Sequence, residues 1–155
     1  MKVVVMPVPV PVIVVSPFEM GEWVVCEMED YTTFAKVEHV YADLEKQRVK
    51  IFGTWGNDSV INAGDRGWFY ADKCRRATEE EIEREERRRV FAAKGRRNNE
   101  FHIGDFVNND SLALMVLGQN PETKIVIVAV NNSDETFEIE AEELELVFAA
   151  EDMCG

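Results

Sequence analysis

The sequence predicts a mainly β protein with two similar halves joined by a charged α-helix. Three observations support this fold class: a seven-residue phrase that occurs twice, short β-rich runs separated by turn residues, and one long charged segment between them. The phrase has the order aromatic, any residue, apolar, Gly, acid, aromatic, Val. Its two copies are Phe18-Glu-Met-Gly-Glu-Trp-Val24 and Phe101-His-Ile-Gly-Asp-Phe-Val107.

Residues 1–17 are predicted to form an extended N-terminal segment, in which Val and Pro alternate. Because proline has no amide hydrogen to donate, Pro7, Pro9 and Pro11 argue against a central strand. An edge strand and a polyproline segment both fit the pattern. The same prolines, with no small-residue cleavage site after them, argue against a signal peptide and a membrane helix.

Short strands are predicted after the first copy of the phrase. They cover Trp23–Cys26, 35–41, 48–52 and Trp68–Tyr70. The stretch 53–67 contains four glycines and is predicted to be a long loop or an irregular hairpin. We expect Trp23 and Trp68 in the core and Trp55, within this glycine-rich stretch, at the surface.

A single helix is predicted over residues 78–93. Thr78 and Glu81 have the spacing of a capping box, in which each side chain accepts from the other residue's amide. Acidic residues come first and Arg87-Arg-Arg89 comes last, which suits the helix dipole. Apolar residues are few, so the helix is predicted to bury a narrow stripe and to act as a connector, followed by a polar linker at 94–99.

The second half repeats the pattern of the first. Strands are predicted at Ser111–Leu117, Lys124–Val130, Thr136–Glu140 and Glu145–Phe148, with a 3₁₀ turn over Ala141–Leu144. Trp68-Phe-Tyr-Ala-Asp-Lys-Cys74 in the first half parallels Glu138-Ile-Glu-Ala-Glu-Glu-Leu144 in the second. The two copies therefore align beyond the opening phrase.

Five short strands with a 3₁₀ turn before the last resemble the SH3-like small barrel. The Gly-acid-x-Val step in each phrase resembles the first strand of KOW-type modules. The resemblance implies two barrels, at 18–77 and at 98–155, joined by the helix and basic linker at 78–97. It also implies a binding module for protein or nucleic acid, since the fold alone does not choose between them.

Charge is unevenly distributed along the chain, whose formal net charge is −13. Residues 71–97 carry ten basic and seven acidic side chains, whereas residues 98–155 carry one basic and thirteen acidic. KOW modules that bind nucleic acid are usually basic, so the acidic second copy departs from that pattern. The three cysteines, Cys26, Cys74 and Cys154, are far apart and odd in number, which favours a reducing, cytoplasmic setting without a disulfide framework.

Catalysis is not predicted. Neither His39 nor His102 lies in a recognisable motif with a nucleophile, and no phosphate-binding or dinucleotide-binding signature occurs. The cysteines and histidines have no metal spacing, so no metal and no cofactor are expected. The function predicted instead is non-catalytic.

A protein-interaction module is the preferred hypothesis. The acidic second barrel is predicted to bind a partner with a basic surface, through the five glutamates of the C-terminal third and through Trp55. These glutamates are Glu138, Glu140, Glu142, Glu143 and Glu145. Ala71-Asp72 followed by Arg75-Arg-Ala-Thr-Glu-Glu-Glu81 resembles accessory proteins of bacterial viruses, which implies an inhibitor of a host protein.

Nucleic-acid binding through the basic segment 73–97 is the first alternative. Arginine complements phosphate, and the residues concerned are Arg75, Arg76, Arg87, Arg88, Arg89, Arg96 and Arg97. Seven acids are interleaved with this segment, so an internally paired helix also fits. The segment can equally dock onto the acidic barrel of its own chain or of a second copy, which would make a homo-oligomer. A small-ligand or nucleotide binder at an oligomer interface is the second alternative.

Overall fold

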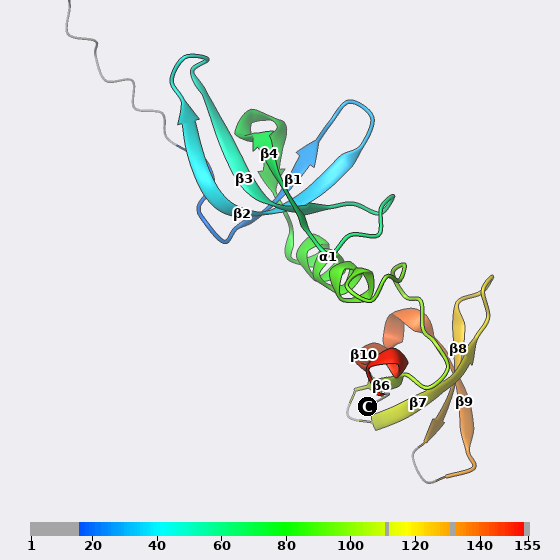
Figure 1. Ribbon diagram of the computed structural model, residues 1–155. Coiled ribbons are helices and arrows are strands. Elements are labelled where there is room, and N and C mark those ends of the chain that lie inside the picture. The colour runs from blue at the N-terminus through cyan, green and yellow to red at the C-terminus, as the bar shows by residue number, and fades with distance from the viewer. Residues whose placement is uncertain (1–15, 111, 131–132, 154–155) are drawn as a thin grey trace, which may run out of the picture. The chain divides into compact units, whose positions relative to one another are not determined.

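The computed structural model describes residues 16–110, 112–130 and 133–153 (Figure 1). The N-terminal Pro/Val segment predicted over residues 1–17 therefore lies outside the description, except for its last two residues, and so does Cys154. Two compact units divide the chain. The first contains the described residues up to Asn57 together with Gly64–Ile82. The second contains Asp58–Ala63 together with the described residues from Glu83 onward.

The first unit holds a five-stranded antiparallel sheet. Its strands are β1 (Trp23–Glu27), β2 (Thr32–Asp43), β3 (Arg48–Gly56), β4 (Asp65–Tyr70) and β5 (Cys74–Arg76), in the spatial order β4-β3-β2-β1-β5. The 3₁₀ helix η1 (Ala71–Lys73) connects β4 to β5. Alternate residues of these strands face a core of small and branched side chains, as period-2 patterning requires. The core residues are Phe18, Val24, Cys26, Ala35, Val37, Ile51 and Ala71.

The second unit holds a sheet of the same connectivity. Its strands are β6 (Phe106–Asn109), β7 (Leu112–Gln119), β8 (Ile125–Val130), β9 (Thr136–Glu140) and β10 (Glu145–Phe148), in the order β10-β6-β7-β8-β9. The 3₁₀ helix η2 (Ala141–Glu143) precedes β10, and η3 (Ala150–Asp152) follows it. The prediction of a mainly β chain with two five-stranded sheets and one helix between them is confirmed.

The helix α1 (Glu79–Ala92) starts with the predicted capping box. The Thr78 hydroxyl accepts from the Glu81 amide at 3.2 Å, and the Glu81 carboxylate accepts from the Thr78 amide at 3.0 Å. At the other end, Phe91 is buried in the second core and packs edge-on against Phe101, with ring centroids 5.2 Å apart. The narrow apolar stripe of the helix is thus used to complete the second unit.

The repeated phrase forms the same turn twice. The Gly21 amide donates to the Val37 carbonyl at 2.7 Å, and the Gly104 amide donates to the Val116 carbonyl at 2.8 Å. Both glycines have positive φ, +89° and +93°, which only glycine adopts without strain. A register shift follows each accepting valine, in β2 and in β7. The repetition in sequence is therefore a repetition of backbone geometry.

Of the two structures predicted for residues 53–67, the hairpin is confirmed, because β3 continues to Gly56, β4 begins at Asp65 and the two strands pair antiparallel. The alternative of a long loop over the whole stretch is wrong. Gly53 and Gly67 lie inside these strands, where they allow close packing. A Cβ at Gly53 would lie 2.0 Å from the Lys36 carbonyl oxygen, and one at Gly67 would lie 2.9 Å from the Trp55 ring. Glycine in a strand marks such close approaches, which the sequence pattern does not separate from a turn.

The expectation of no disulfide is also wrong, since Cys26 and Cys74 are joined. The strand β5 was not predicted, and its pairing with β1 sets Cys74 directly opposite Cys26. The two cysteines are 48 positions apart in sequence, so spacing alone did not indicate the bond. In the described part of the chain, no helix has the length and apolar run of a membrane span. A cytoplasmic location stays a prediction.

Candidate functional site

An acidic groove of about 700 Å³ lies in the second unit, between α1 and the segment formed by η2 and β10. The groove has charged walls and an apolar floor. Its walls carry six carboxylates and one guanidinium. These are Glu83, Glu86, Asp110, Glu142, Glu143, Glu145 and Arg87.

The local structure explains how the carboxylates reach the groove. Glu83 and Glu86 are three residues apart on α1, so they lie on the same helix face. Glu142 and Glu143 belong to the short turn η2, and Glu145 opens β10. All six carboxylate side chains are on exposed residues, so they are open to solvent.

The floor of the groove is apolar. Phe91 and Leu144 belong to the core of the second unit, and Leu146 packs against that core. Val90 stays 50% exposed on the helix side of the groove. A ligand that enters the groove therefore meets an apolar strip flanked by negative charge.

Arg87 is the cation that lines this groove, and its hydrogen bonds hold it against the wall. Its guanidinium donates to the Asn99 side chain at 2.8 Å and to the Ala141 carbonyl at 2.9 Å. Burial lowers the pKa of Arg87, while the nearby carboxylates of Glu145 and Glu142 oppose that shift. Both of these acceptors are neutral groups, so the two hydrogen bonds of Arg87 do not neutralise any of the six carboxylates.

The structure separates the five predicted glutamates into two groups. Glu142, Glu143 and Glu145 line the groove, whereas Glu138 and Glu140 lie exposed on β9, outside its lining. Sequence reasoning missed the helix contribution from Glu83 and Glu86, since the acids of the helix were considered only as partners of its own arginines. The i, i+3 spacing of the two was the available signal.

The tryptophans exchange their predicted places. Trp55 lies in β3 and packs, half-buried, against the first core, on the same side as Ile51. Trp68 is 55% exposed, because its neighbour Phe69 takes the inward position of β4. The expectation that Trp68 is a core residue is therefore wrong. The alternation along β4 decides the matter, and it was hidden by three consecutive aromatic residues.

Most arginines of the basic segment 73–97 have carboxylate partners within their own unit. Arg75 binds Glu81 at 2.8 Å in the first unit, where Arg76 also binds Glu22 at 3.0 Å. In the second unit, the buried Glu85 binds Arg88 and lies 3.8 Å from Arg89. Burial raises the pKa of Glu85, against the opposing effect of Arg88 and Arg89.

The linker after α1 is held onto the second unit by its basic residues. Lys94 binds Asp152, and the buried Arg96 binds both Asp105 and Glu151. The sequence allowed the basic segment to dock onto the acidic half of its own chain or of a second copy. Lys94 and Arg96 bind acids of their own chain. Association with a second copy stays a prediction.

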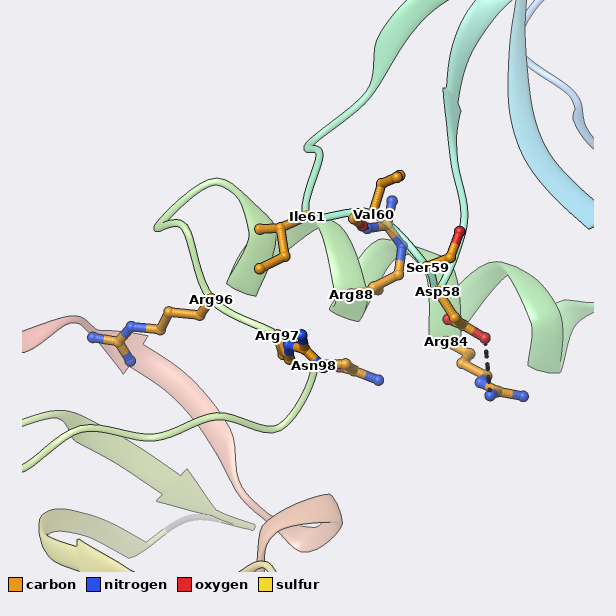
Figure 2. Close-up of a pocket in the computed structure, with 9 residues that line it drawn as sticks. All are labelled: Asp58, Ser59, Val60, Ile61, Arg84, Arg88, Arg96, Arg97 and Asn98. Atoms are coloured by element: carbon orange, nitrogen blue, oxygen red, sulfur yellow. Dashed lines mark hydrogen bonds and ion pairs between the residues drawn. The ribbon is translucent and has the colours of Figure 1, made fainter. Parts of the chain in front are cut away.

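A second cavity, of about 430 Å³, lies where residues 58–63 meet α1 and the linker (Figure 2). Four arginines line it, but they do not converge on one point. Arg84 is directed to Asp58, and Arg88 donates to the Val60 carbonyl and to the Asn62 side chain. Figure 2 shows the Arg96 side chain directed away from the others. The fourth, Arg97, is exposed.

Within the described residues, no three side chains of His, Cys, Asp or Glu are grouped as metal ligands. A scan against models of protein families found no match for this chain, and a search among curated proteins found none either. Function is therefore inferred from the groove itself.

Proposed function

We propose that this protein is a non-catalytic interaction module whose acidic groove binds a basic segment of a protein partner. The observation that carries the proposal is the combination of six carboxylates with an apolar floor. Opposite charges steer the partner and fix its register, while the floor supplies area to bury. A ligand of matching chemistry alternates Arg or Lys with apolar side chains.

We further propose that both sheets are SH3-like small barrels of the KOW type. The strand orders β4-β3-β2-β1-β5 and β10-β6-β7-β8-β9, each with a 3₁₀ turn before its last strand, support this assignment. Barrels of this kind serve as binding modules, which agrees with a non-catalytic role. An inhibitor that occupies the basic surface of a host protein is the specific form of this function that we favour.

The proposal is tested with a short peptide that alternates Arg and Leu, titrated into the full chain and followed by calorimetry. We expect saturable one-to-one binding that weakens as salt is raised from about 0.05 to about 0.5 M, because screening shortens the reach of exposed charges. The double variant Glu142→Gln/Glu145→Gln removes two groove carboxylates. We expect it to weaken binding about fivefold or more, since each exposed ion pair contributes up to about 1 kcal/mol.

The matched control is Glu138→Gln/Glu140→Gln, which removes the same charge from the same unit outside the groove lining. We expect this control to bind almost as well as the unaltered chain. Equal weakening by both double variants would mean that overall negative charge binds the peptide, and it would overturn the groove. A control peptide with Glu in place of Arg should not bind.

The nucleic-acid alternative is tested in the same experiment with a single-stranded oligonucleotide. We expect no binding even at low salt, because Arg75, Arg76, Arg88 and Arg96 have carboxylate partners. Tight binding that falls steeply with salt and is lost on neutralising Arg87, Arg88 and Arg89 would favour this alternative over the groove.

A further inference from the structure

An apolar hollow of about 400 Å³ lies in the second unit, on the solvent side of β6, β7 and β10. These three strands are neighbours in the second sheet (Figure 1). The residues that line the hollow are Phe106, Val107, Asn108, Ala113, Val147, Phe148 and Met153. Val107 belongs to the core, so the residues on either side of it in β6 point to the opposite face of the sheet. We call this cavity the apolar hollow.

Strand register brings the walls of the apolar hollow together. Phe148 of β10 pairs with Phe106 of β6, and Asn108 of β6 pairs with Ala113 of β7. Val147 falls at the register shift of β10, between two paired residues. Because the walls belong to paired strands, little has to be ordered when a ligand enters, which lowers the entropy cost of binding.

Large apolar side chains of the hollow are exposed in the described structure. Val147 is 57% exposed, Phe148 is 49% exposed and Met153 is 45% exposed. Apolar surface gathered around a concave site is typical of a place where a ligand docks. The volume of the hollow falls within the range of about 300–1,000 Å³ that is usual for ligand pockets, so it can take one large side chain.

The apolar hollow adjoins the acidic groove. Asn108 lines both of them. Within β10, Glu145 and Leu146 line the groove, and the next two residues of the strand, Val147 and Phe148, line the hollow. Three residues separate Glu145 from Phe148, which is about 10 Å along a strand. A single extended segment that follows β10 therefore meets both sites.

The two adjoining sites differ in the charge that they accept. None of the described residues that line the apolar hollow is charged. The two acids that precede Met153 are in ion pairs, Glu151 with Arg96 and Asp152 with Lys94. The hollow therefore accepts an uncharged side chain, whereas the carboxylates of the groove favour cations.

This combination of charges favours a basic partner over a second copy of the chain. Two copies that meet at their apolar hollows would bring two acidic grooves together, and each chain has a formal net charge of −13. Like charges of this size repel. A basic segment with an apolar residue close to its cations complements both sites at once.

We propose that the apolar hollow holds one large apolar side chain, Trp, Phe or Leu, of the same partner segment that binds the acidic groove. This inference rests on the proposed function of the groove. It defines the partner more closely, as a basic segment whose apolar anchor lies about 10 Å, or three extended residues, from the cation that faces Glu145. The cations steer and orient the segment, while the anchor supplies most of the affinity, as buried aromatic residues do at protein interfaces.

A site in two parts also gives selectivity. A basic segment that lacks the anchor binds only through exposed ion pairs, which are weak and are screened by salt. An apolar segment that lacks the cations is not steered to the groove. Only a segment that carries both at the matching spacing uses the whole surface, so partners are discriminated by the anchor and its distance from the cations.

The experiment compares peptides by calorimetry on the full chain. The parent is the peptide that alternates Arg and Leu, with Arg at both ends. Two longer peptides carry the extension Gly-Ser-Trp, one at each terminus, so that either direction of the segment along β10 is tested. We expect one of the two to bind about tenfold or more tightly than the parent, because burying a side chain of this size contributes at least that much. The same peptide with Ser in place of Trp should bind no better than the parent.

Two variants of the chain locate the gain. Phe148→Ser removes a wall of the apolar hollow, and Ala113→Tyr fills it from an exposed position. Each should bring the extended peptide down to the affinity of the parent. The matched control is Phe137→Ser, which removes an equally exposed phenylalanine from β9, at the other edge of the same sheet and outside both sites. This control should keep the gain in full.

The outcomes separate this inference from the proposed function. Binding of the parent with no gain from either extension would overturn the anchor site and leave the groove in place. If none of the peptides binds, the groove is wrong and the anchor site falls with it. A gain that survives in Phe148→Ser and Ala113→Tyr would put the tryptophan elsewhere and overturn the anchor site. So would a gain that declines as the concentration of the chain is raised, because a second copy would then occupy the apolar hollow.

Discussion

The two sheets share one connectivity and one opening turn, yet the acid of the repeated phrase has opposite surroundings in the two units. Glu22 is partly exposed and binds the exposed Arg76. Asp105 is fully buried with Arg96, and it also accepts from the amides of His102 and Ala150, each at 2.8 Å. The same position therefore carries a surface pair in one copy and a buried ionic network in the other.

The shared part of the phrase is its turn. The Glu22 carboxylate accepts from the Glu19 amide at 3.3 Å, and the Asp105 carboxylate accepts from the His102 amide, three residues earlier in both cases. The acid thus closes the turn in each copy. What differs is the cation, since Arg76 comes from β5 whereas Arg96 comes from the linker after α1. A repeated motif thus encodes a backbone turn, whereas the ion pair that its acid forms depends on the residues packed around it.

The solvent faces of the two sheets differ as well. Phe52 pairs with Trp68 in the first sheet, and the corresponding pair in the second is Ile127 with Glu138. One row further on, Tyr70 corresponds to Glu140. The same connectivity therefore carries an aromatic solvent face in the first sheet and an acidic one in the second.

The largest effect is expected from Asp105→Ala. The change leaves the buried Arg96 with Glu151 alone and leaves two amides without their acceptor, so we expect a loss of about 3–5 kcal/mol from the second unit. All three tryptophans and all three tyrosines lie between residues 23 and 70. Their fluorescence therefore reports the first unit, while amide hydrogen exchange at β7 and β8 reports the second.

The expected outcome of this variant is fast exchange in β7 and β8 with an unchanged fluorescence transition. Burial by itself would raise the pKa of Asp105, but the hydrogen bonds from Arg96, His102 and Ala150 hold it below its ordinary value. Asp105→Asn keeps the shape and loses the charge, so it should fall between Ala and the unaltered chain. Unchanged exchange in Asp105→Ala would show that the buried network does not stabilise the second unit.

Reduction of the disulfide should have the next largest effect, and this effect should be confined to the first unit. Reduction of the bond between Cys26 and Cys74 frees a loop of 48 positions, and a bond of this kind contributes about 2–4 kcal/mol. We expect the fluorescence transition in urea to move to lower concentration on adding reductant, while hydrogen exchange in the second unit stays the same. A thiol count on the unfolded, unreduced chain should find one free thiol. Three free thiols would contradict the bond.

Much of the fold follows from the sequence, because the phrase, the turn residues and the capping box are local signals. The positions of β9 and β10 were predicted to the residue, and the helix to within one residue at each end. The strand β5 was missed, since three residues, Cys74–Arg76, are too short to show alternation. Its absence from the prediction also hid the disulfide.

The sites were harder to predict than the fold. The acidic groove needs Glu83 and Glu86 from the helix beside Glu142 and Glu145 from the second sheet, and only packing brings them together. The exposed aromatic pair of the first sheet depends on strand register, which set Trp68 opposite Phe52. A single strand read alone gave Trp68 an inward position, because Phe69 and Tyr70 next to it are also aromatic and show no alternation with polar residues.

The helix cap is expected to have a smaller effect, and its loss has a defined pH range. Thr78→Ala removes the hydroxyl that accepts from Glu81, for a loss of about 1 kcal/mol. The hydrogen bond from Arg75, with help from the Thr78 amide, lowers the pKa of Glu81 to about 2. Because its pKa is lowered on folding, the Glu81 carboxylate contributes its full stabilisation above the ordinary pKa of about 4.5. That stabilisation is lost as the pH falls towards 2. Stability measured in Glu81→Gln should lack this acid-dependent part, and a profile identical to that of the unaltered chain would contradict the assignment.

The smallest effect is expected from Glu22→Ala, and it is the sharpest test of the comparison. The variant removes the counterpart of Asp105 from the first copy, together with a pair whose cation is 69% exposed on its side chain. Exposed pairs contribute up to about 1 kcal/mol, so the fluorescence transition should shift only slightly. The small share of stability that salt screens in the pair of Glu22 with Arg76 should be absent from the variant. Gly21 and the hydrogen bonds between Val37 and the Gly21–Glu22 backbone remain, so the turn itself should persist. A loss as large as that of Asp105→Ala would mean that the acid is required by the turn in both copies. A small loss would mean that the backbone alone suffices to form the turn. The acid would then be needed for stability only in the second copy, where Asp105 belongs to a buried ionic network.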